Sequence, residues 1–348
     1  MLDKEKEMKA EDPNVRLKTF DIEFPRDGGN VVNNEVYLGG KQQCQVNIIV
    51  QKERRNAEGI WELAAFEATE LESATVVEYS TNPEATIPAG WYCDTKRNEF
   101  NMGRWSGVLE EPSMATAPSN PIIQPMPGIG PLENEKRYLR CDLRSTGNQQ
   151  FMAKITVGRK TYTTNMERDN VNYQSSVTVK CQEPYTLSAE RLDHWADTDA
   201  FSVQGVDVDI YYWTPPLGLR FVENIPPTDP VKLKDPSVQG DHFDIYYTRD
   251  IGHGIRQIGG VIRGNTVGNI TMNSLLKKSS GGNELIPANK RNTIMRAARV
   301  KAWLNNPNTD QQGASIWTMV DSYGCSHHYY LTETDNYNVM VLRATSKP

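Results

Sequence analysis

The sequence lacks the features by which secreted, membrane-spanning and disulfide-rich chains are usually recognised. It has five cysteines in 348 residues and no Cys-x-x-Cys pair, which excludes a dense disulfide framework. No run approaches the ~18 consecutive apolar residues that a membrane-spanning helix needs. Residues 1–12 are a mixed-charge run without an apolar core, so we expect no secretory signal. We expect synthesis in the cytoplasm, with action outside only after lysis or signal-independent export.

Motifs for nucleotide-dependent or metal-dependent chemistry are also missing. The glycines of 252–260 do not match a phosphate-binding loop and indicate a hairpin tip instead. Asp193, Asp197 and Asp199 fall in a loop-like stretch, but their spacing departs from that of a calcium loop. No catalytic triad or carboxylate pair can be identified, although such groups assemble only in space. We therefore expect no cofactor and no metal, and the sequence favours a protein without enzymatic activity.

Cysteine and histidine come together only in residues 324–328. On a strand, Cys325 and His327 would share one face and His328 would point away, which leaves too few ligands for zinc. A thiol nucleophile would also need an orienting group and an oxyanion site, and neither can be identified. The simpler interpretation of all five cysteines is free, buried thiols.

The composition is that of an ordered β protein. The chain has 15 tyrosines, 7 tryptophans and 38% hydrophobic residues, which argues against disorder. Its formal net charge of -6 gives no general attraction to nucleic acid, which we do not expect as a partner.

One short sequence motif occurs twice in the chain. Residues 206–213 and 241–248 both contain Asp-Ile-Tyr-Tyr. Because strand side chains alternate between faces, Ile210 or Ile245 should share a face with the second tyrosine of its copy, while the aspartate and the first tyrosine face the other way. Proline-containing segments between the copies cannot lie in a central sheet. We predict two half-buried antiparallel strands, with the chain leaving a sheet and returning to it, as in a β-sandwich.

We therefore predict an all-β protein of two β-sandwich domains, immunoglobulin-like or jelly-roll-like. Residues 1–18 are a charged, mobile N-terminal arm, 19–183 the first sandwich and 184–348 a second β-rich domain. Six prolines in 111–131 indicate an extended crossover within the first sandwich, because the three strands that follow are too few for a separate domain. Residues 292–304 fit either a helix or a strand, and the sheet context favours a strand.

Individual elements follow from alternation and β-branched residues. Strands are expected at 20–24, 44–50, 74–79, 91–93, 100–102, 137–143, 151–157 and 175–181, and at 314–320, 325–331 and 337–342, with one or two helical turns between 63 and 71.

The strongest electrostatic feature is a run of cations with one acid, Glu284, inside it. Its members are Lys277, Lys278, Lys290, Arg291, Arg296, Arg299 and Lys301. The run predicts a site for an anionic partner, such as a phosphate, a sulfated glycan or an acidic surface on another copy. A solvated strand edge protected by charge explains it equally well.

Aromatic and acidic side chains on the duplicated strands are further candidates. Tyr211, Trp213 and Tyr246 could present a flat surface to a sugar or a protein, the alternative being packing across strands. Asp207 and Asp209 share one strand face, where the simplest interpretation is exposure to solvent.

The sequence thus favours a non-enzymatic structural or recognition protein that acts through its surfaces, as a self-assembling subunit or as a binding module of an assembly. Two alternatives stay open. One is a secreted or injected bacterial toxin or effector that binds a host surface or membrane, and the other is a glycan-binding or carbohydrate-active protein. The expected partners are other copies of the chain, a host surface or a glycan.

Overall fold

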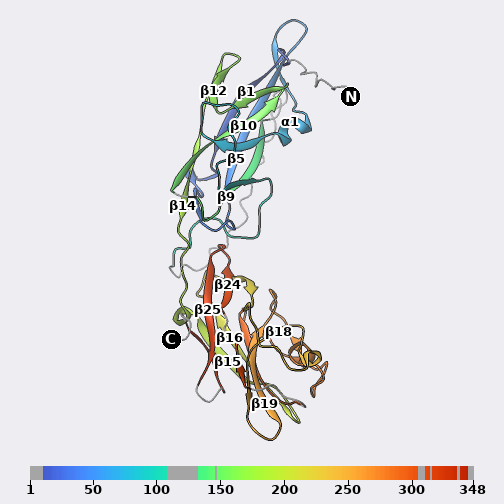
Figure 1. Ribbon diagram of the computed structural model, residues 1–348. Helices are drawn as coiled ribbons and strands as arrows, with labels where there is room; N and C mark the ends of the chain where they lie inside the picture. Colours follow the sequence, from blue (N-terminus) through green and yellow to red (C-terminus); the bar gives the residue numbers. More distant parts are fainter. Residues whose placement is uncertain are drawn as a thin grey trace, which may run out of the picture. The chain divides into compact units, whose positions relative to one another are not determined.

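The computed structural model describes residues 11–107, 132–145, 147–304, 310–313, 316–334 and 338–343. Strands make up almost all of the regular structure (Figure 1), so the all-β prediction is confirmed. The described residues form two compact units, one of residues 11–104 and 132–184 and one of residues 105–107 and 185–343. The proline-rich stretch 111–131 and residues 1–10 of the expected arm lie outside the described residues.

The first unit is a sandwich of two five-stranded sheets. One sheet has the order β1 (Val15–Glu23), β5 (Cys44–Arg55), β9 (Glu133–Cys141) and β8 (Trp91–Asp94), with β6 (Trp61–Ala64) beside β5. The other has the order β11 (Lys160–Thr163), β10 (Asn148–Val157), β14 (Val177–Gln182) and β4 (Glu35–Tyr37), with β7 (Thr75–Glu78) beside β10. Alternate residues of the two sheets, such as Ile48 of β5 and Phe151 of β10, meet in one apolar core.

Short elements complete the first unit. They are the hairpins β2 (Arg26–Asp27) with β3 (Asn30–Val31) and β12 (Asn165–Arg168) with β13 (Val171–Gln174), and the helix α1 (Ala68–Glu72). The helical turn before residue 74 is confirmed. β1 begins at Val15, inside the stretch expected to be an arm. The strand predicted at 100–102 is wrong, because the Asn98 side chain accepts the Phe100 N–H (3.2 Å) and turns the chain there.

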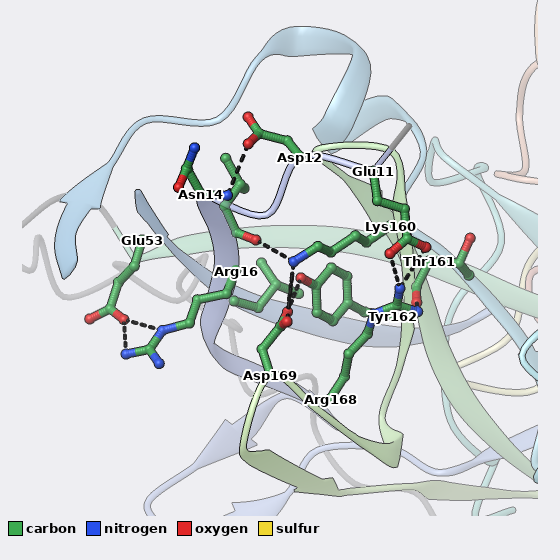
Figure 2. A network of polar contacts seen from close by, with 12 residues as sticks. Glu11, Asp12, Asn14, Arg16, Glu53, Lys160, Thr161, Tyr162, Arg168 and Asp169 are labelled. Atoms are coloured by element: carbon green, nitrogen blue, oxygen red, sulfur yellow. Dashed lines mark hydrogen bonds and ion pairs between the residues drawn. The ribbon is translucent and has the colours of Figure 1, made fainter. Parts of the chain in front are cut away.

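A polar network joins three elements of the first unit (Figure 2). Lys160 is 5% exposed, and its ammonium donates to the Val15 carbonyl (3.0 Å) and to Asp169 (3.1 Å). The Tyr162 hydroxyl donates to the same carboxylate (2.7 Å). Asp169 lies in the β12–β13 turn at a φ of 54°, so this buried cation ties the turn to β1 and β11. All of these groups bind one another, which assigns them a structural role.

The second unit also contains two main sheets. The larger has the order β15 (Asp193–Val203), β16 (Val206–Thr214), β22 (Arg296–Trp303), β19 (Ile255–Ile262), β18 (Phe243–Asp250) and β23 (Gln311–Gln312). The smaller has the order β17 (Phe221–Ile225), β24 (Ile316–Asp321), β25 (Ser326–Glu333) and β26 (Met340–Arg343). Around them lie β20 (Ile270–Thr271), α2 (Met272–Leu275), β21 (Leu285–Ile286) and the 3-10 turns Ala189–Arg191 and Pro236–Val238.

The path between the two Asp-Ile-Tyr-Tyr copies is the predicted one. The chain leaves the six-stranded sheet after β16, forms β17 in the other sheet and returns as β18. The ambiguous segment 292–304 forms strand β22, which confirms the preference for strand over helix.

The prediction that both copies are half-buried is wrong. β16 is buried from Val208 to Trp213 and β18 from Phe243 to Thr248. One face of the six-stranded sheet packs with residues of the four-stranded sheet, including Trp317 and Tyr329. Its other face packs under α2 and the segments around Val231 and Ile286. Both faces are covered, so the polar residues of β16 and β18 need partners inside the protein.

A β-bulge changes the second copy. The pairing of β18 with β19 shifts register between Ile245 and Tyr247. In β16, Ile210 and Tyr212 share one core, as alternation predicts. In β18, Tyr247 joins Tyr246 in the other core, so its predicted place beside Ile245 is wrong. The bulge supplies the extra residue that reverses its face.

No helix in the described ranges is long and apolar enough to cross a membrane.

Candidate functional site

The seven cations of residues 277–301 do not share one surface. Arg296 is 2% exposed and donates to the carbonyls of Gly268 (2.7 Å) and Thr266 (2.9 Å), and burial lowers its pKa. Arg299 is 5% exposed and binds Asp209 (Nε to Oδ2, 2.6 Å) and Asp207 (3.0 Å). Burial lowers the pKa of Arg299, but the two aspartates outweigh it and the net pKa is raised. Both arginines are structural cations inside the sheet.

The other five cations are divided among three separate places. Lys290 pairs with Asp197 of β15 (2.5 Å), and Arg291 lies over the Trp195 ring (4.8 Å). Lys301 is half-buried in β22, opposite Asp207 and Gln257. Lys277 and Lys278 line an open hollow of about 540 Å³ together with Asp241, His242 and the start of α2. Lys277 binds Asp241, whose pKa it lowers, and Lys278 donates to the Ser237 hydroxyl (2.5 Å).

The aromatic candidates are buried. Tyr211, Trp213 and Tyr246 are 1%, 2% and 6% exposed, so they pack between the sheets and present no flat surface to a partner. The interpretation of Asp209 as solvent-facing is also wrong, since it is 3% exposed. Asp207 is half-buried, and Arg299 of the neighbouring strand holds both carboxylates.

Asp193, Asp197 and Asp199 lie on strand β15 rather than on a loop. In the part of the chain that the structure describes, no group of three or more His, Cys, Asp or Glu side chains is arranged to hold a metal ion.

The cysteine–histidine segment forms a hydrogen-bonded cluster. Cys325 and His327 are buried and His328 is exposed, as predicted for a strand. The Nε2 of His327 lies 3.0 Å from Asp321 Oδ2, and its Nδ1 accepts the Leu187 backbone N–H (3.1 Å). An Nδ1 that accepts a hydrogen bond carries no proton, so the ring is neutral and Nε2 donates to the aspartate. Both ring nitrogens are occupied, and burial raises the pKa of the Cys325 thiol to about 12. This arrangement does not activate a nucleophile.

A larger hollow lies in the first unit, and we call it the loop hollow. Its volume is about 700 Å³. Its lining comes from the turn after β4, from the end of β8 with the turn that follows it, and from β9. The lining residues are Gly40, Lys41, Gln43, Cys93, Asp94, Thr95, Lys96, Arg97, Asn98, Glu99, Phe100 and Arg140.

Two amide side chains fix the 94–100 turn of the loop hollow. Gln43 is 2% exposed, donates to Asp94 (2.8 Å) and the Lys96 carbonyl (3.2 Å), and accepts the Asn98 N–H (2.8 Å). The Asn98 side chain donates to the Lys41 carbonyl (2.6 Å). Arg140 closes the side of the hollow through an ion pair with Asp94 (2.8 Å). The turn is therefore held in one conformation before any ligand arrives.

The loop hollow is positively charged. Four cations and two carboxylates line it, which gives a formal net charge of +2. Lys96 and Arg97, at the top of the turn, are exposed, and neither has an ion-pair partner among the described residues. The hollow beside α2 has two lysines and one aspartate, a net +1, and its Lys277 is already paired. Of the two hollows, the loop hollow thus holds the more available positive charge.

Sequence reasoning missed the loop hollow for a definite reason. Residues 94–99 contain Asp94, Lys96, Arg97 and Glu99, so their local charge sums to zero. The excess comes from Lys41 and Arg140, which the fold brings in from 53 residues before and 46 residues after Asp94. The adjacent Lys96 and Arg97 in a polar turn were the one local signal.

No family model and no curated protein matches the chain. Several solved structures are similar to it at low levels, and two of them are described next. One, described as "BspA_C_mut", has 10% sequence identity, with 94% of this chain and 98% of that chain covered at a TM-score of 0.20. The C-terminal domain of the Streptococcus pyogenes antigen I/II-family protein AspA has 11% identity, with 94% and 99% covered at a TM-score of 0.20. At that TM-score neither likeness carries an argument about this chain's function.

Proposed function

We propose that this protein is a non-catalytic recognition module that binds an acidic glycan in the loop hollow of its first unit. The observation that carries the proposal is the pair Lys96 and Arg97. Both cations are exposed, both lack an ion-pair partner among the described residues, and both stand on a turn that Gln43 and Asn98 hold in place.

Preorganisation is the first physical support. Binding costs free energy when a loop must be ordered, and a turn already fixed by buried hydrogen bonds avoids most of that cost. The Gln43 and Asn98 side chains tie the turn to the backbone next to β5. Lys96 and Arg97 therefore keep only their side-chain freedom, and a ligand need not fold the loop around itself.

The mixture of groups in the loop hollow supports a glycan over a simple anion. The cations attract a sulfate or carboxylate, while the exposed Glu99 can accept sugar hydroxyl groups. A bare phosphate would meet that carboxylate as a repulsive charge. The volume of about 700 Å³ lies within the range of pockets that bind small ligands. An acidic sugar chain can bind both kinds of group in the hollow, because its anionic groups pair with the cations and its hydroxyl groups donate to the carboxylate.

The test compares two matched double variants of the full chain. Binding to heparin, used as a sulfated probe, is measured by calorimetry for Lys96→Ala/Arg97→Ala and for Lys277→Ala/Lys278→Ala. Each removes two adjacent cations from the lining of a hollow. We expect the first to weaken binding about 10-fold or more, equivalent to at least 1.4 kcal/mol, and the second to leave it within about 2-fold. Raising the salt concentration should weaken wild-type binding.

Three other outcomes of these measurements would each lead to a different conclusion. Equal losses in both variants would show unspecific charge attraction and contradict the proposal. A loss in the Lys277/Lys278 variant alone would move the site to the second unit. If no acidic polysaccharide binds while light scattering shows a large assembly at low and physiological salt, the protein is a self-assembling subunit instead.

A further inference from the structure

Two cysteines of the first unit lie in contact across the sandwich. We propose that Cys141 and Cys181 form a disulfide that joins the two sheets when the folded protein meets a disulfide oxidant such as oxidised glutathione. The proposal is independent of glycan binding, because it rests on a different set of residues and on thiol chemistry alone.

The fold brings the two thiols together from opposite sheets. Cys141 is the last residue of β9 and Cys181 lies one residue before the end of β14. Their Sγ atoms are 3.5 Å apart, and both side chains belong to the same apolar core. A disulfide has an S–S length of ~2.05 Å, so a closure of about 1.5 Å is needed, which small side-chain rotations can supply.

The backbone around the pair already holds the two strand ends together. The segment after β4 donates to both, with Leu38 N–H on the Gln182 carbonyl (2.9 Å) and Gly40 N–H on the Cys141 carbonyl (2.6 Å). Val36 of β4 pairs with Cys181 itself. The strand ends are thus fixed next to each other in the reduced protein, so the disulfide needs no rearrangement of the sheets.

The other three cysteines have no such partner. The Cys44 thiol lies near the Asn33 carbonyl (3.7 Å) and the Cys93 thiol near the Thr75 hydroxyl (3.8 Å). Cys325 belongs to the second unit. All five cysteines are described, so thiol–thiol contact singles out one pair.

The two thiols have different chemical roles. Cys181 is half-buried, and its hydrogen bond with Cys141 lowers its pKa, whereas that bond and burial raise the pKa of Cys141. The Cys181 thiolate attacks one sulfur of oxidised glutathione and releases a glutathione thiolate. Cys141 then loses its proton and attacks the Cys181 sulfur, which releases the second glutathione. Two protein thiols lose two electrons and two protons, and one glutathione disulfide becomes two thiols.

The closed loop spans the 40 residues from Cys141 to Cys181. A cross-link over a loop of this length restricts the unfolded chain and typically raises the midpoint of thermal unfolding by roughly 5–15 °C in a domain of this size. The cross-link lies in the first unit, so the thermal midpoint of that unit should rise. The thermal midpoint of the second unit serves as the internal reference in the same sample.

The experiment counts thiols in the folded full-length protein. The protein is incubated with excess oxidised glutathione, free thiols are alkylated under denaturing conditions, and intact mass and peptide mapping follow. We expect five alkylated cysteines before oxidation and three afterwards, since two enter the disulfide. We also expect a mapped peptide that links Cys141 to Cys181, a higher melting temperature, and reversal by dithiothreitol.

Matched variants decide the assignment. Cys93→Ala removes a half-buried thiol outside the pair, and it should still lose two thiols on oxidation. Cys181→Ala should keep all four of its remaining thiols free after oxidation. Five free thiols in the oxidised wild type would overturn the proposal, as would a stable glutathione adduct on Cys181 or a linked peptide with another cysteine. Peptide mapping of the wild type answers the question even if a variant does not fold.

Discussion

The two Asp-Ile-Tyr-Tyr copies lie in one sheet and bury their ion pairs to different extents. Asp209 and Asp244 are each 3% exposed, and each binds an arginine. The side chain of Arg299, which binds Asp209, is 6% exposed. The side chain of Arg263, which binds Asp244, is 47% exposed. The same four residues therefore give one ion pair in the interior and one at the surface.

The position of the arginine explains the difference. Arg299 lies on β22, which has β16 on one side and β19 on the other, and it also binds Asp207. Arg263 follows the last residue of β19, where the strand ends and its side chain meets water. The repeated motif determines the local strand structure. The position of the partner arginine in the fold determines how much the ion pair contributes, because a carboxylate left unpaired where water cannot reach it costs much free energy.

The largest expected effect comes from breaking the interior pair. Arg299→Met removes the cation and leaves Asp209, whose pKa burial already raises, without its charged partner. We expect the free energy of unfolding to fall by about 3–5 kcal/mol, because a buried carboxylate is left uncompensated. Chemical denaturation followed by tryptophan fluorescence measures this loss.

The surface pair is the matched control. Arg263→Met also removes an arginine bound to an aspartate of the same motif, but water can reach the vacated position. We expect a loss of about 1–2 kcal/mol. Equal losses in the two variants would mean that burial of the arginine does not decide the energy of the pair.

Sequence reasoning reached the strands because they depend on neighbours in the chain. Alternation and β-branched residues located β5 and β10, and the prolines between the copies indicated the departure from the sheet and the return to it. The ion pair between Asp209 and Arg299 could not be predicted, because the two residues are 90 residues apart in the sequence. The loop hollow was hidden for the same reason, since Lys41 and Arg140 come to it from two other parts of the chain.

The bulge in the second copy was also not predicted, but for a different reason. Nothing in Asp244-Ile-Tyr-Tyr distinguishes it from the first copy, yet Tyr247 changes face. Its ring lies over Gly259 of β19, where a Cβ would overlap it. The signal was therefore on the neighbouring strand, as a glycine in the middle of a strand pattern.

The second prediction tests that contact. Gly259→Ala should lower the free energy of unfolding by about 3 kcal/mol, at the upper end of the typical cost of overpacking, because the new methyl group must displace the Tyr247 ring. Gly268→Ala is the control, since Gly268 has open space and no positive φ. Thermal unfolding of both variants gives the comparison. A Gly259 variant as stable as the Gly268 variant would mean that the ring does not depend on this glycine.

Apart from the Arg263 control, the smallest expected effect concerns the second tyrosine of each copy, Tyr212 and Tyr247. Both are 0% exposed although they lie on opposite faces of the sheet. Burial raises the pKa of Tyr212 to about 12 and raises that of Tyr247 in the same direction. An unfolded phenol ionises near pH 10, so the folded state favours the neutral form. The stability from this preference is fully present below pH 10 and is lost as pH rises towards 12.

Phenylalanine variants measure that loss. Tyr212→Phe should reduce the fall in unfolding free energy between pH 9 and pH 12 by about 2–3 kcal/mol, from a pKa difference of about 2 units. At pH 7 it should change stability little, since the hydrogen bond that the hydroxyl donates to the Pro287 carbonyl is long (3.4 Å). Tyr247→Phe should act in the same direction. If only one variant reduces the alkaline loss, the two faces of the sheet differ in how well they exclude water, and the bulge that reversed Tyr247 also changed its environment.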